Sequence, residues 1–182
     1  MTTRTAVAQL PLPGLRLRTR TIVGFLAVAI AATLVFALLA LRSSQSPEVT
    51  GYLSNLAPVT EHHNEVMNRW NSFVTVHNAT ATLWISAYDD EAAAAYAEVS
   101  AIAAEAEAVR SEWASIQPPA SHAEPYALVL EAMRLTSTGI AGVADYFADA
   151  RTGEASIEQA RAALALIAEA SGYWSRARAF ES

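Results

Sequence analysis

The sequence of 182 residues contains no cysteine. Disulfide bonds, thiolate metal ligands and a cysteine nucleophile are therefore excluded. Lysine is also absent, so all 12 basic residues are arginines, a usage typical of GC-rich bacterial genomes. Glycine and proline are scarce, with seven of each. A chain rich in alanine with so few helix-breaking residues favours an all-α fold.

Acidic residues are absent before Glu48, so all 18 lie within residues 43–182. Only seven arginines accompany them there, which gives this part a net charge of −11. Such a surface repels phosphate groups, and we expect no nucleic-acid partner. The sequence also carries no Ser-His-Asp set, phosphate-binding loop or paired acids in a catalytic context. We therefore predict a protein that is not an enzyme and needs no cofactor.

One long apolar run lies near the N-terminus, at residues 22–41. Twenty uncharged residues match the thickness of a bilayer core, about 30 Å at about 1.5 Å per helical residue. Four arginines precede the run and one follows it, so the positive-inside rule predicts a cytoplasmic N-terminus. This divides the chain into a cytoplasmic segment at 1–21, a transmembrane signal-anchor helix at 22–41, a stalk at 42–57 and an extracytoplasmic domain at 58–182.

A cleaved signal peptide is the alternative interpretation of this run. Signal peptides have apolar regions of about 7–15 residues and a small-residue cleavage site. The run here is longer, and Leu39-Ala40-Leu41 is a poor cleavage site, so the pattern favours an uncleaved anchor. Gly24 and the alanines that follow it would let another transmembrane helix approach closely.

Apolar residues recur at heptad spacing through the rest of the chain, for example at Leu56, His63 and Trp70. This spacing predicts helices of similar length joined by short connections, which is typical of an up-down-up-down antiparallel four-helix bundle. The predicted helices cover residues 59–87, 90–116, 121–151 and 155–181.

Signals at the helix ends support these boundaries. Pro118 and Pro119 cannot continue a helix, and they end the second one. Ser121 and Ser156 each begin a Ser-x-x-Glu/Gln sequence and predict capping boxes. Pro58 predicts a kink or a restart where the stalk meets the bundle. Ser46-Pro47-Glu48 is typical of a helix start, so a helical stalk is compatible with the sequence.

The anchor, the heptad pattern and the Trp-Ala-Ser-Ile-Gln-Pro-Pro sequence at 113–119 resemble the membrane-tethered four-helix bundles of bacterial sensor ectodomains. The resemblance implies a fold and leaves the function open. Sensors of this kind usually carry a second span and a cytoplasmic signalling domain, and the sequence shows neither pattern. We therefore expect any signal to pass through a membrane partner.

The candidate metal ligands at the membrane-proximal end are His62, His63, His122 and Glu181. A zinc or copper site needs three or four such ligands. The Glu-x-x-His pair typical of metal sites in bundles is missing from the chain. Buried histidines hydrogen-bonded to neighbours are the favoured interpretation, and a pH-sensing histidine is a further alternative.

Aromatic residues at helical spacing most often form a core. The small residues of the third helix nevertheless leave room for a ligand cavity if the large rings do not fill it. The residues of this alternative pocket are Trp70, Trp84, Thr136, Ser137 and Ile140.

The fourth helix carries a second apolar stripe that includes Leu166, Tyr173 and Phe180. It is either the edge of a wide buried face or a docking surface. We predict an accessory or scaffold subunit in the cell membrane, acting through contacts with another membrane or extracytoplasmic protein or with a second copy. The alternative is a bundle that binds or senses a small ligand and relays through a membrane partner.

Overall fold

The computed structural model describes residues 46–78 and 89–180, and this part of the chain is all-α, without strands. Four helices run in the order α2 (Pro47–Asn78), α3 (Asp89–Ala114), α4 (Ala123–Ala150) and α5 (Ile157–Ala179). A short 3-10 turn, η1 (Ala120–His122), precedes α4. The packing is compatible with a helical bundle, as the sequence predicted.

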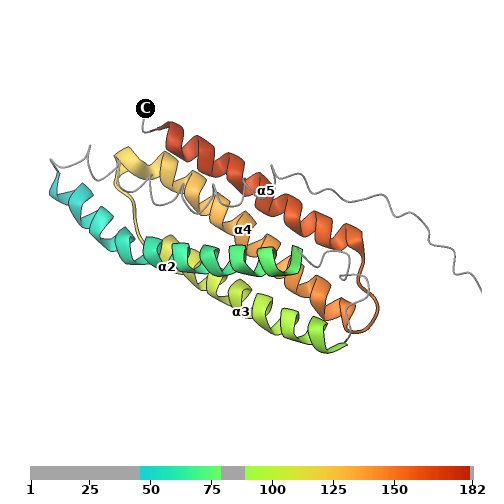
Figure 1. Ribbon diagram of the computed structural model, residues 1–182. Coiled ribbons are helices and arrows are strands. Elements are labelled where there is room, and N and C mark those ends of the chain that lie inside the picture. The colour runs from blue at the N-terminus through green and yellow to red at the C-terminus, as the bar shows by residue number, and fades with distance from the viewer. Residues whose placement is uncertain (1–45, 79–88, 181–182) are drawn as a thin grey trace, which may run out of the picture.

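The helices pack in sequence order, each against the next. The most extensive packing joins α4 to α5, α3 packs on α4, and α2 packs on α3. Figure 1 shows the start of α2, the α3–α4 connection and the end of α5 at one end of the molecule. The α4–α5 connection lies at the opposite end. Helix α2 contacts α4 through the Phe73 and Phe147 rings and α5 through the His63 and Trp174 rings.

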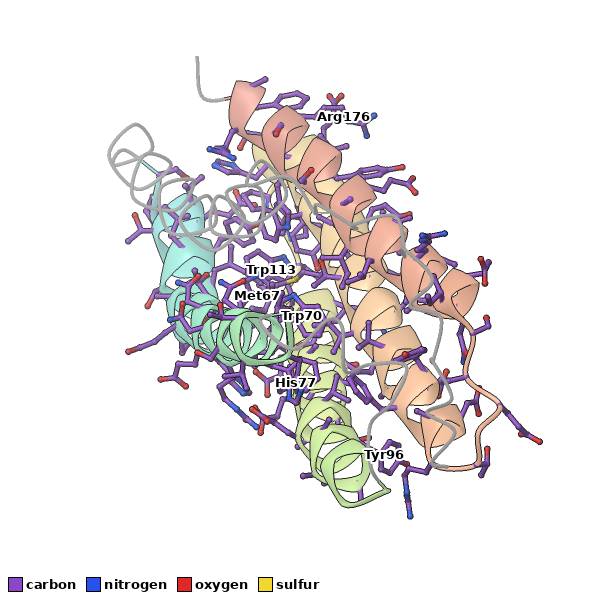
Figure 2. The ribbon with its side chains drawn as sticks, turned by 45° about the vertical axis from the view of Figure 1, so that its right-hand side comes forward. Met67, Trp70, His77, Tyr96, Trp113 and Arg176 are labelled. Atoms are coloured by element: carbon purple, nitrogen blue, oxygen red, sulfur yellow. The ribbon has the colours of Figure 1, made fainter. Side chains whose placement is uncertain are left out.

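The core consists mainly of the residues that the heptad spacing selected. Leu56, Trp70, Val99 and Ile140 are all fully buried, and Figure 2 shows Met67, Trp70 and Trp113 gathered between the helices. The agreement follows from amphipathicity, because a helix with one apolar stripe gains most by turning that stripe inward.

The largest difference from the predicted boundaries is at the start of α2. The sequence placed 42–57 in a stalk outside the bundle, with a helix start at Ser46-Pro47-Glu48. Helix α2 does begin at Pro47, but it is continuous with the bundle helix, and Tyr52 and Leu56 are buried in the core. The stalk prediction rests on the predicted second helix, which is too short to cover this segment. The η1 turn lies there instead, and the Tyr52 and His122 rings are 5.6 Å apart.

Helix α2 continues through Pro58 and bends along its length in Figure 1. Proline lacks the N–H of a helical hydrogen bond and displaces the preceding turn, so it bends a helix. Pro58 is exposed, where water can satisfy the carbonyl that loses its donor.

The two predicted capping boxes have different outcomes. Ser156 caps α5 by accepting a hydrogen bond from the Gln159 amide at 3.1 Å, while the Gln159 side chain bonds to Asp149. The Ser121 box does not form. The Ser121 hydroxyl contacts His122 Nδ1, and α4 starts after His122 without a side-chain cap. The η1 turn takes up the residues that the box required.

The predicted transmembrane run at 22–41 lies outside the described residues. Within them, one stretch, Ala120–Ala150, is long and apolar enough to span a bilayer, but 56% of its apolar window is buried inside the protein. That burial is typical of the central helix of a domain core.

Candidate functional site

Helix α5 is held against α4 by unusually close backbone packing. A Cβ atom placed on Gly139 would lie 2.7 Å from the Ala163 carbonyl oxygen, and one on Gly142 would lie 2.9 Å from the Ala163 Cβ. Ile167 fills the space beside Gly139. The small residues of α4 therefore admit a neighbouring helix, and α5 occupies that space.

The described residues of the pocket expected from the sequence are all buried. Ile140 is fully buried, and the Thr136 hydroxyl donates to the Ala132 carbonyl at 2.9 Å. The Ser137 hydroxyl lies 3.2 Å from a Glu107 carboxylate oxygen and 3.1 Å from the Arg134 carbonyl. Trp70 is buried, while Trp84 lies outside the described residues. The described hydroxyls thus bond within the protein.

The second stripe of α5 is divided between the core and the surface. Its alanines, Ala163 and Ala170 among them, are buried against the rest of the protein. Leu166 and Tyr173 are half-buried at the edge of the core, and Phe180 is 49% exposed. The stripe is therefore a wide buried face whose large members reach the surface.

Tyr173 forms the centre of this surface row. The Arg176 guanidinium lies 4.5 Å from the centroid of the Tyr173 ring, a cation–π contact, and Figure 2 shows Arg176 on the outer side of α5. Arg134 of α4 lies nearby. Its pKa is raised, first by hydrogen bonds to Glu131 and less by the Tyr173 and Glu169 charges. Leu166, Tyr173, Arg176 and Phe180 are called the α5 surface row below.

The three described histidines of the proposed metal set lie in different surroundings. His62 Nδ1 is 3.5 Å from the Glu112 carboxylate at the surface. His63 is buried with its ring 5.5 Å from the Trp174 ring, and His122 is buried against Tyr52. Glu181 lies outside the described residues. Within residues 46–78 and 89–180, no three His, Asp or Glu side chains are grouped closely enough to hold a metal ion.

His63 is a buried histidine whose pKa lies well below the ordinary value. Burial, assisted by the His62 charge, lowers the pKa of His63 to about 4. Its Nε2 atom is buried without a hydrogen-bond partner, as are the indole nitrogens of Trp70 and Trp174. Each unpaired buried donor or acceptor costs about 1–3 kcal/mol. The contact between α2 and the rest of the core therefore leaves buried polar atoms without hydrogen bonds.

One surface feature was missed by the sequence analysis. A groove of about 590 Å³ lies between α2 and the C-terminal end of α3. It is lined by Asn55, Val59, Glu112, Ser115, Ile116 and Gln117. The sequence feature that could have indicated this groove is the last turn of α3, which contains Glu112 and no basic residue.

Comparison with protein-family models, curated proteins and solved structures gives no match.

Proposed function

We propose that this protein is a membrane-anchored interaction module, an accessory or scaffold subunit that binds another protein through the α5 surface row. In this proposal residues 22–41 are the anchor, and an up-down-up-down bundle lies on the extracytoplasmic side. The partner is a second copy of the chain or another membrane or extracytoplasmic protein.

The observation that carries the proposal is the composition of the row. Tyrosine and arginine are enriched among residues that dominate binding energy at protein interfaces. Here Tyr173 is stacked with Arg176, and Leu166 and Phe180 extend the apolar surface along the same helix. The buried alanines fix α5 against α4, so the row is displayed on a rigid element.

The packing of α4 favours this function over the alternative of a ligand-binding bundle. A cavity at the small residues of α4 would need the space that Ala163 and Ile167 occupy. Sensing through that part of the core would first require α5 to move away.

Site-specific photo-crosslinking in native membranes tests the proposal. A photoreactive amino acid replaces Tyr173 in one variant and Glu98, an exposed residue on α3, in the control. We expect a discrete adduct from position 173 and none from position 98, and Arg176→Ala should reduce its yield severalfold. The proposal fails if both positions give the same adducts, or if position 173 gives none while the protein is folded.

A further inference from the structure

The α2–α3 groove has the dimensions of a small-molecule site. Ligand-binding clefts commonly measure about 300–1,000 Å³, and this groove measures about 590 Å³. Val59, which is 9% exposed, and the half-buried Ile116 contribute its apolar surface. The other lining residues are polar and exposed: Asn55, Glu112, Ser115 and Gln117.

The electrostatics of the groove favour a cation. It lies at the C-terminal end of α3, where the helix dipole presents partial negative charge, and the carbonyls of Ser111, Glu112 and Trp113 there already accept hydrogen bonds. Basic residues usually occupy this position, but the last turn of α3 has none and carries Glu112. The whole helix contains seven acidic residues against one arginine.

The groups around the groove add hydrogen-bond acceptors. Asn55 and Gln117 each bring an amide oxygen, and the Ser115 hydroxyl donates to the Glu112 carbonyl, which leaves its lone pairs able to accept. The Nδ1 atom of His62 lies 3.5 Å from a Glu112 carboxylate oxygen. That distance is at the long limit of a hydrogen bond, so the carboxylate keeps capacity for a stronger donor.

We propose that this groove binds a small organic cation, an ammonium group carried on an apolar body. The ammonium group lies against Glu112 and the end of α3, and the apolar body packs on Val59 and Ile116. This site is separate from the α5 surface row and does not depend on the function proposed for that row.

A matched ligand series tests the inference on the full chain in a non-ionic detergent. Phenethylammonium, 2-phenylethanol and phenylacetate share an apolar body and differ in charge. Their affinities are measured by isothermal titration calorimetry. We expect phenethylammonium to bind at least about tenfold more tightly than the alcohol, and the carboxylate not to bind.

Three variants localise the binding. Glu112→Gln should weaken phenethylammonium about tenfold. Glu98→Gln removes the same charge from the same helix, fourteen residues away, and should leave affinity within about twofold. Asn55→Trp, at an exposed position, should fill the groove and abolish binding while Glu112 remains. Circular dichroism verifies that each variant is folded.

The inference is overturned if the alcohol binds as tightly as the ammonium. It is also overturned if Glu98→Gln weakens binding as much as Glu112→Gln, since the attraction would then be a property of the whole acidic surface. Unchanged binding to folded Asn55→Trp would place the ligand elsewhere and would equally refute the site.

Discussion

The two halves of this domain are held together by different kinds of packing. The α4–α5 pair joins through glycine and alanine, with backbones close enough that a Cβ on Gly139 would overlap Ala163. Helix α2 meets the same core through large rings, including Trp70 and Phe73, and through the buried His63. Small residues give a tight contact with little polar burial, whereas large aromatic rings bring polar atoms into the core.

This difference indicates which perturbation destabilises each helix contact. Helix α2 carries buried nitrogen atoms without partners on His63 and Trp70, and Trp174 of α5, whose ring lies beside His63, carries a third. Each has a desolvation cost. Tight helix packing, in contrast, resists any change of volume. We therefore expect acid to act on α2 and added side-chain volume to act on α5.

The largest expected effect is acid destabilisation through His63. Its pKa is about 4 in the folded protein and 6.5 as the ordinary value, so unfolding is accompanied by proton uptake between these limits. Above pH 6.5 His63 is neutral in both states and does not lower the free energy of unfolding. As the pH falls from 6.5 to 4, the free energy of unfolding declines by about 3 kcal/mol because only the unfolded state takes up the proton. Urea unfolding followed by tryptophan fluorescence at pH 7 and pH 4 measures the loss.

The comparison variant is His63→Leu, which removes the titrating group and keeps an apolar side chain in the core. Its stability should fall less than that of the natural protein over the same pH range. Equal losses in both proteins would assign the acid sensitivity to other groups.

The next largest effect is expected at the α4–α5 contact. Gly139→Ala places a methyl group against the Ala163 backbone and should destabilise the protein by about 1–2 kcal/mol. Gly172→Ala on α5 is the matched substitution, because no atom lies within 4 Å of its added Cβ. It should stabilise by up to about 1 kcal/mol through helix propensity. Thermal unfolding of both variants measures the two effects, and effects of the same sign would contradict the close packing.

The smallest effect is expected from the ion pair between Arg69 of α2 and Glu105 of α3. Both side chains are more than 40% exposed, so water screens the pair, and a double-mutant cycle should give a coupling of about 0.2–1 kcal/mol. The coupling should shrink as salt is added. The Arg134–Glu131 pair within α4 is the control, since it joins no two helices. Coupling above about 2 kcal/mol for Arg69–Glu105 would show that α2 is held electrostatically.

The candidate sites were only partly predictable from the sequence. Heptad spacing identified Leu166, Tyr173 and Phe180 as a second stripe, but it could not separate a buried face from a docking surface. The structure places the alanines of the stripe in the core and its large side chains at the surface. The α2–α3 groove depends on residues about sixty positions apart, such as Asn55 and Glu112, and no local pattern links them.

The sequence by itself determined the all-α class, the four segments and most buried positions, because helix periodicity and burial are properties of neighbouring residues along the chain. Only the tertiary structure decided that α2 packs into the bundle from its first turns, that Gly139 and Gly142 admit α5, and that His63 is buried beside Trp174. Each of these depends on which helix lies opposite, and that is set by packing between distant segments.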